Sequence, residues 1–137
     1  MSAAVFVDTA YLIALLDVRD TRSREAVELA KKLAGKSAHL ITTDAVFLEF
    51  ANYFARSPLR RQAIDWIVKI RAAEGWEIIS IERGMLARAD ARYRAHDDKN
   101  WSLTDCLSME VMVARRIEDI ATTDGGFRQA GFHVLMP

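Results

Sequence analysis

The sequence predicts a single α/β domain over residues 1–137, a three-layer α/β/α sandwich around a central, mostly parallel sheet of about five strands. The first observation is that short apolar segments rich in β-forming residues alternate with longer segments of helical periodicity, which is typical of parallel sheets covered by helices. The second is a hydrophobic content of 51%, enough for a substantial core without disulfide bonds. We expect strands near residues 3–7, 39–42, 76–81, 119–123 and 132–136.

The first strand is expected at residues 3–7, a continuous apolar run of the kind found in strands that are buried on both faces. A short helix follows at about residues 11–16. Asp20 and Thr21 are then expected to cap a second helix, in which apolar residues recur at helical spacing until Gly35 ends it.

The middle of the chain predicts two helices and a strand. Thr43 and Asp44 open the first helix, and Pro58 breaks it because proline cannot donate a backbone hydrogen bond. A second amphipathic helix is expected at about residues 59–73, with Gly75 as its end and the third strand directly after it. The apolar faces of these helices can lie in the core or in a dimer interface, and the core is the better expectation.

The C-terminal part predicts two more helices. An amphipathic helix is expected at about residues 83–95, and a polar loop at 96–100 leads to an apolar helix at about 104–116. After the fourth strand, residues 124–126 have the sequence Asp-Gly-Gly and predict a turn. The last strand closes the domain.

The formal net charge is +0, so the chain lacks the overall basic character of a protein that coats nucleic acid. Its arginines nevertheless cluster, and a guanidinium group suits phosphate oxygens. Each cluster taken alone is more often a solvated helix face. The clusters are Arg56, Arg60 and Arg61; Arg83, Arg88, Arg92 and Arg94; and Arg115 with Arg116.

Cysteine content and hydropathy predict a cytoplasmic protein without a membrane segment. Cys106 is the single cysteine, so an internal disulfide is excluded, and we expect it to be a small buried residue rather than a nucleophile. Residues 1–8 are too short for an export signal. The longest apolar runs fall well below the roughly 18 residues that a membrane span requires.

Four acidic residues stand where the predicted fold places ligand-binding groups. Asp8 ends the first strand, Glu49 lies in the helix after the second, Asp105 lies in the first turn of the apolar helix, and Asp124 follows the fourth strand. Because ligands of parallel sheets bind at the carboxyl ends of the strands, we expect these four carboxylates to converge.

Each acid also has a purely structural interpretation. Asp8 and Asp124 can be a helix cap or a turn residue, and Ser102 with Asp105 matches the pattern of a capping box. Glu49 is harder to explain in this way, since its neighbours at helical spacing are largely apolar. Four acids at one edge of a sheet repel one another unless a cation compensates their charge.

Carboxylate oxygens without histidine or thiolate partners suit a hard cation, Mg²⁺ or Mn²⁺. Such ions support phosphodiester hydrolysis, because they polarise the phosphate and activate water. Nearby hydroxyl groups are candidates to orient the carboxylates or the water. These are Thr9, Ser102, Thr104 and Thr122, each of which also has an ordinary capping or strand role.

Other chemistries are poorly supported by the sequence. His39, His96 and His133 are scattered and lack the spacing of zinc ligands. The chain has no glycine-rich phosphate loop and no Gly-x-Ser-x-Gly motif, which argues against a P-loop enzyme or an α/β-hydrolase.

The acids and their surroundings resemble the PIN-domain nucleases, especially the VapC-type toxins, from about Val5 to Val134. The segments that carry the resemblance are Val7-Asp8-Thr9, Glu49 after Thr42-Thr43-Asp44, Asp98-Lys99-Asn100-Trp101-Ser102-Leu103-Thr104-Asp105-Cys106-Leu107-Ser108, and Thr122-Thr123-Asp124-Gly125-Gly126-Phe127 with Ala130-Gly131-Phe132. The Trp-Ser-Leu-Thr-Asp-Cys segment followed by Thr-x-Asp-x-x-Phe is the specific part.

The resemblance implies a PIN-like α/β/α fold and an endoribonuclease that cleaves RNA at a Mg²⁺ or Mn²⁺ site. Carried over residue by residue, the metal-site acids are Asp8, Glu49, Asp105 and Asp124, and the cleavage would leave a 3′-hydroxyl and a 5′-phosphate. Ala10 stands where many relatives have a small hydroxyl residue. The resemblance also implies a homodimer and a small antitoxin protein that silences the acidic groove.

Two alternatives remain open. One is a solitary PIN-like module that binds RNA or protein without cleaving, in which one acid points away from the others or metal does not bind. The other is a receiver-type signalling domain, which also gathers acids around Mg²⁺. A receiver requires paired acids after the first strand and a lysine after the last, and Asp8-Thr9 and residues 132–137 lack them.

Overall fold

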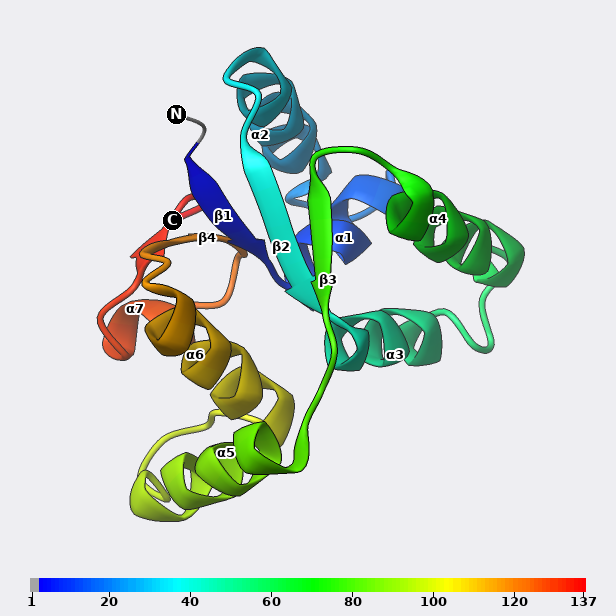
Figure 1. The fold of residues 1–137 in the computed structure, drawn as a ribbon. Coiled ribbons are helices and arrows are strands. Elements are labelled where there is room, and N and C mark those ends of the chain that lie inside the picture. Colours follow the sequence, from blue (N-terminus) through cyan, green and yellow to red (C-terminus); the bar gives the residue numbers. More distant parts are fainter. Residues whose placement is uncertain (1–2) are drawn as a thin grey trace.

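A computed structural model describes residues 3–137 and confirms the predicted α/β/α sandwich (Figure 1). Its sheet has five strands in the order β3-β2-β1-β4-β5, and all four pairings are parallel. The strands are β1 Ala4–Val7, β2 His39–Thr43, β3 Trp76–Ile79, β4 Asp119–Ala121 and β5 His133–Val134.

Helices cover both faces of the sheet. The chain runs from β1 to β2 and β3, and then returns past β1 to β4 and β5, so right-handed crossovers place the early and late helices on opposite faces. One group consists of α1 Thr9–Leu16, α2 Ser23–Gly35, α3 Asp44–Tyr53 and α4 Arg60–Ala72. The other consists of α5 Arg83–Ala95, α6 Leu103–Arg115 and α7 Gly126–Gln129.

The central strand β1 is buried on both faces because helices cover both. Val5, Phe6 and Val7 are at most 2% exposed, although consecutive side chains of a strand point to opposite faces. This explains why the strand is continuously apolar rather than alternating. It also fixes Asp8, the next residue, at the edge of a rigid element.

Helix α3 packs its apolar face into the core and leaves other apolar side chains outside. Phe50 is 0% exposed. Its ring centroid lies 5.3 Å from that of Phe54, edge to face, and 6.4 Å from that of Trp66 on α4, on which it stacks. Leu48 and Tyr53 on the same helix are 64% and 60% exposed. We expected the apolar side chains of these helices to lie in the core. Some of them do, but others are exposed to solvent.

One local prediction was wrong, and one short helix was not predicted. Helix α2 begins at Ser23, and its N-cap residue is Arg22, which makes no side-chain cap bond. Asp20 instead accepts a hydrogen bond at 2.8 Å from the backbone N–H of Arg22, so it stabilises the turn before the helix. The Asp-Gly-Gly turn leads directly into the four-residue helix α7, which is too short for periodicity to predict.

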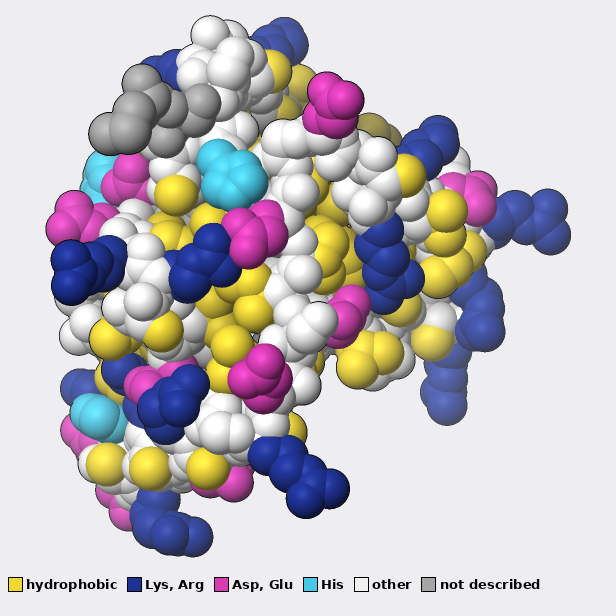
Figure 2. Space-filling view, in the orientation of Figure 1, with side chains coloured by type: hydrophobic (Ala, Val, Ile, Leu, Met, Phe, Trp, Pro, Cys, Tyr) yellow, Lys and Arg dark blue, Asp and Glu magenta, His cyan; other side chains and the backbone are white. Residues whose placement is uncertain are grey.

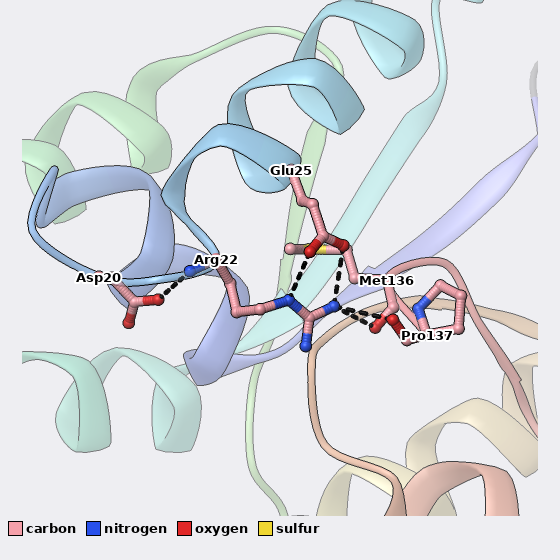
Figure 3. A network of polar contacts seen from close by, with 5 residues as sticks. All are labelled: Asp20, Arg22, Glu25, Met136 and Pro137. Atoms are coloured by element: carbon pink, nitrogen blue, oxygen red, sulfur yellow. Dashed lines mark hydrogen bonds and ion pairs between the residues drawn. The ribbon is translucent and has the colours of Figure 1, made fainter.

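Arg22 joins the start of α2 to the C-terminal segment (Figure 3). Its guanidinium group donates to both carboxylate oxygens of Glu25, at 2.7 and 2.9 Å. It also donates to the carbonyl oxygens of Met136 and Pro137, at 3.1 and 2.9 Å. This network ties the residues after β5 to the helix layer.

Among residues 3–137, no helix is long and apolar enough to cross a bilayer.

Replacing the buried ring of Phe50 tests the α3–α4 core. We expect Phe50→Ala to lower the free energy of unfolding by about 3–5 kcal/mol, because it leaves a cavity among Phe54, Trp66 and the sheet. The matched control is Leu48→Ala on the exposed side of the same helix, for which we expect a loss below about 1 kcal/mol. Urea denaturation measures both, and equal losses would contradict the packing described here.

Candidate active site

A cleft of about 540 Å³ lies outside the carboxyl ends of β1 and β4, where the strand order reverses. Crevices at such a switch point are the usual ligand sites of parallel sheets. All four predicted acids lie on its wall, together with residues from α1, α3 and the start of α6. The lining residues are Asp8, Thr9, Ala10, Ile13, Glu49, Asn52, Tyr53, Ser102, Asp105 and Asp124.

Asp8 is the most buried of the four acids, at 3% exposure. Its backbone N–H donates to the carbonyl oxygen of Ala121 at 3.2 Å, which extends the β1–β4 pairing to this residue. Its Oδ2 accepts a hydrogen bond from the Thr122 hydroxyl at 2.7 Å. Its Oδ1 is buried and has no hydrogen-bond partner among residues 3–137. A buried carboxylate oxygen without a partner is costly and points to a ligand.

Asp105 is held by the capping box at the start of α6. Its Oδ2 accepts from the backbone N–H of Ser102 at 2.9 Å, and its own N–H donates to the Ser102 hydroxyl at 3.0 Å. The structural interpretation and the functional one are therefore compatible, because the cap occupies one carboxylate oxygen and fixes the direction of the other.

Asp124 is positioned by the turn that precedes α7. Its Oδ1 accepts from the backbone N–H of Gly126 at 2.8 Å, and its N–H donates to the Thr122 hydroxyl at 3.0 Å. A Cβ atom at Gly126 would lie 3.0 Å from Cδ1 of Trp101 and 3.1 Å from Oδ1 of Asp124. Glycine therefore allows this turn to pack closely against the Trp101 ring.

Glu49 reaches the cleft from α3, on the side opposite α6. The helix is capped by Thr43, whose hydroxyl accepts from the N–H of Val46 at 3.4 Å. Glu49 is partly buried, and no hydrogen bond to its carboxylate is found within the described chain. Asn52 and Tyr53 line the same wall, since residues three and four positions along a helix share a face.

Burial and mutual repulsion raise the pKa of two of the acids. Desolvation, with further repulsion from Asp105 and Glu49, raises the pKa of Asp8 to about 7, although the bond from Thr122 opposes the shift. Desolvation also raises the pKa of Asp105 to about 6, with repulsion from Asp124 and Glu49. The carboxylates thus repel one another across the cleft, and a bound cation would reduce this repulsion.

The donor chemistry of the cleft fits a hard cation, although the ligands do not form a closed set. Over residues 3–137, no three Asp, Glu, His or Cys side chains are placed so that they hold a metal ion as they stand. Each aspartate nevertheless keeps one carboxylate oxygen, Oδ1 of Asp8 and Asp105 and Oδ2 of Asp124, outside the hydrogen bonds found in this part of the chain. Anchored carboxylates with a spare oxygen suit Mg²⁺ or Mn²⁺.

The hydroxyl residues singled out in the sequence differ in position. Thr122 contacts Asp8 and Asp124, and Ser102 contacts Asp105. Thr9 lines the cleft with a buried hydroxyl that lacks a partner within the described residues. Thr104 lies in the first turn of α6, off the cleft wall, and no hydrogen bond in the described chain joins it to an acid. Sequence reasoning missed three lining residues, and helical spacing was the only signal for them: Asn52 and Tyr53 lie three and four positions after Glu49, and Ile13 lies four positions after Thr9.

The chain matches the PIN domain family over residues 5–133, and it belongs to that family. It is similar over nearly its whole length to a VapC-type toxin. It is 28% identical over 139 aligned positions to the 23S rRNA-specific endonuclease VapC20 of Mycobacterium tuberculosis, covering 97% of this chain and 98% of that protein.

Solved structures agree with this assignment. The crystal structure of Mycobacterium tuberculosis VapC20, described as a sarcin-ricin loop cleaving toxin, superposes with a TM-score of 0.87 at 26% identity, covering 97% of this chain and 99% of that chain. A toxin-antitoxin complex from Klebsiella pneumoniae gives a TM-score of 0.58 at 18% identity, covering 88% and 87% of the two chains. This second match supports the fold alone.

The raised pKa of Asp8 predicts a pH-dependent stability in metal-free protein. The folded protein keeps a proton that the unfolded chain loses above its ordinary pKa of 3.8, so stability falls as pH rises from about 4 to about 7. We expect Asp8→Asn to be more stable above pH 7, by up to about 4 kcal/mol, and to keep only the smaller decline up to about pH 6 that the raised pKa of Asp105 contributes.

Urea denaturation across this pH range, with chelator present, measures the difference. Asp65→Asn on the exposed side of α4 is the matched control and should keep the wild-type decline. Parallel pH profiles for wild type and Asp8→Asn would show that burial of Asp8 does not perturb its proton affinity.

Proposed function

We propose that this protein is a metal-dependent endoribonuclease of the VapC type that hydrolyses RNA phosphodiester bonds at the acidic cleft. The observation that carries the proposal is the buried carboxylate of Asp8, with one oxygen bonded to Thr122 and the other facing no partner in residues 3–137. Three more acids line the same cleft. The similarity to an rRNA-specific endonuclease over nearly the whole chain supports the same class of reaction.

We assign the cation to Asp8, Asp105 and Asp124, with Glu49 closing the site from α3. The chemistry that Mg²⁺ or Mn²⁺ supplies in such sites is activation of water and neutralisation of charge on the phosphate. The protein's part is orientation. Thr122 holds Asp8 and the backbone of Asp124 together, and Ser102 holds Asp105. In-line attack of water on phosphorus would leave a 3′-hydroxyl and a 5′-phosphate.

The substrate that fits best is a structured RNA with an accessible single-stranded loop, as the sarcin-ricin loop named for VapC20 suggests. The net charge of +0 argues against broad coating of RNA. On the face drawn in Figure 2, Lys and Arg side chains project over the regions of α4 and α5, with Asp and Glu side chains between them. RNA would therefore contact separate basic groups rather than one continuous basic surface.

A small antitoxin protein that covers the acidic cleft is the partner expected for a toxin of this class, and a cytoplasmic homodimer is the expected form of the free toxin. The similarity to VapC20, which is a toxin, supports an antitoxin partner. The exposed apolar residues of α3 and α4 offer surface for a protein contact: Leu48, Tyr53, Ile64 and Val68.

One observation favours a second candidate, a PIN module that binds RNA or protein without cleaving it. The four acids surround the cleft, but over residues 3–137 they do not form a ready-made metal-ligand group. If metal binding does not draw them together, the cleft has no means to activate water.

Cleavage of a total-RNA pool by purified protein separates these two candidates. We expect cutting with Mg²⁺ or Mn²⁺, its complete loss with chelator, and a loss of more than about 100-fold in both Asp8→Asn and Asp105→Asn, because each removes a negatively charged ligand. Asp65→Asn, an exposed acid on α4, is the matched control and should retain activity. Cutting that survives chelation, or equal rates in all variants, would refute the acidic site.

Thr122 tests the orientation of the acids. Thr122→Val keeps the shape but removes the hydroxyl that bonds Asp8 and the Asp124 backbone, so we expect activity and metal affinity to fall about 10- to 100-fold. Thr122→Ser restores the hydroxyl and should recover most of the loss. Titration of metal at fixed RNA concentration measures the affinity. A serine variant as poor as the valine variant would mean that the methyl group, not the hydroxyl, matters.

A further inference from the structure

A second pocket, of about 410 Å³, lies beside the acidic cleft at the junction between α5 and α6. Its walls are formed by Tyr93, His96, Asp97, Lys99, Asn100 and Trp101. Ser102, which caps Asp105, lines both the pocket and the acidic cleft, so the two hollows are neighbours. Apart from Ser102, none of the residues that line this pocket has a role in the cation site assigned above.

Hydrogen bonds to other parts of the protein fix the rings of His96 and Trp101 in this pocket. The ring of His96 lies 4.8 Å from that of Trp101, tilted by 37°. Its Nδ1 is 3.0 Å from the carbonyl oxygen of Arg92 and must donate, because a carbonyl oxygen only accepts. Trp101 is 8% exposed and donates through Nε1 to Gln129 at 3.2 Å. Rings fixed in this way lose little entropy when a ligand stacks on them.

The composition of the pocket matches a nucleotide better than a simple anion. The Tyr93 ring is 52% exposed although it is a large apolar group, and it stands one helical turn before His96. Lys99 contributes a cation whose pairing with Asp98 is loose, at 3.6 Å. Asn100 offers an amide that can donate and accept. Asp97 on the wall disfavours a site built for phosphate alone.

We propose that this pocket binds an unpaired base of the RNA, stacked on Tyr93 and His96, while the adjoining phosphodiester lies in the acidic cleft and Lys99 contacts a neighbouring phosphate. Unstacked bases commonly bind aromatic side chains in this way, each contributing about 1–3 kcal/mol. The proposal rests on the proposed ribonuclease function, because the shared Ser102 wall makes the pocket a subsite of that cleft. It makes Tyr93 and His96 determinants of where the strand is cut.

Binding of RNA without cleavage tests the base pocket directly. The probe is a fluorescein-labelled, short single-stranded RNA of mixed sequence, measured by anisotropy with Mg²⁺ in an Asp8→Asn background so that it stays intact. We expect Tyr93→Ala to weaken binding about 5- to 150-fold, and Tyr93→Phe to leave it nearly unchanged. The matched control is Leu86→Ala, an exposed apolar residue of the same helix α5.

A second set of probes, in which each base in turn is replaced by an abasic sugar, identifies the stacked base. One abasic position should weaken binding in the Tyr93-containing background and add little in Tyr93→Ala, because both changes remove the same contact. Three results would overturn the proposal: losses of affinity that are additive at every abasic position, an unchanged RNA affinity in Tyr93→Ala, or no binding of the probe. A pocket that serves a protein partner would give the second of these results.

Cleavage by protein with Asp8 intact distinguishes failure of this inference from failure of the proposed function. If metal-dependent cutting occurs at the same sites and rate in Tyr93→Ala, the ribonuclease stands and the base pocket is refuted. If the protein does not cut but Tyr93→Ala and the matching abasic probe show non-additive losses, the base pocket stands and the proposed hydrolysis is wrong.

Discussion

The pairing of β1 with β4 is the constraint on which the acidic cleft depends. Val7 lies opposite Ala121 in the parallel register, so Asp8 and Thr122 leave the sheet side by side. The Thr122 hydroxyl then bonds the Asp8 carboxylate and the backbone N–H of Asp124. A register shift of one residue would direct these side chains to opposite faces and separate them. Residues far apart in the chain thus meet through sheet geometry.

The same geometry places charge where it is unfavourable. Asp8 is almost fully buried among other acids, which raises its pKa to about 7 and lowers the stability of the metal-free fold at neutral pH. The buried core of β1 and α3 provides the compensating free energy. A site that is destabilised without its ligand gains the most when a cation neutralises it, since binding then relieves repulsion as well as forming bonds.

In the proposed ribonuclease, recognition of RNA would differ from simple electrostatic attraction. A chain without net charge and with four acids in its cleft would repel a polyanion there unless a cation neutralised the acids. Stacking of a base on Tyr93 and His96 would supply affinity that does not depend on charge. Because Ser102 borders both hollows, the base pocket would also position the strand relative to the acids.

The sequence by itself determined the fold class, the order of elements and the four acids, because apolar runs, helical periodicity and strand-end positions are local or topological signals. It did not reveal α7, the start of α2 or the exposure of Leu48 and Tyr53, which depend on what packs against each segment. Only the tertiary structure decided that Thr122 bridges two acids, that Thr104 lies off the cleft and that His96 and Trp101 form a second pocket. The physical reason is that side-chain contacts between distant segments follow from strand register and helix packing, which spacing along one chain does not specify.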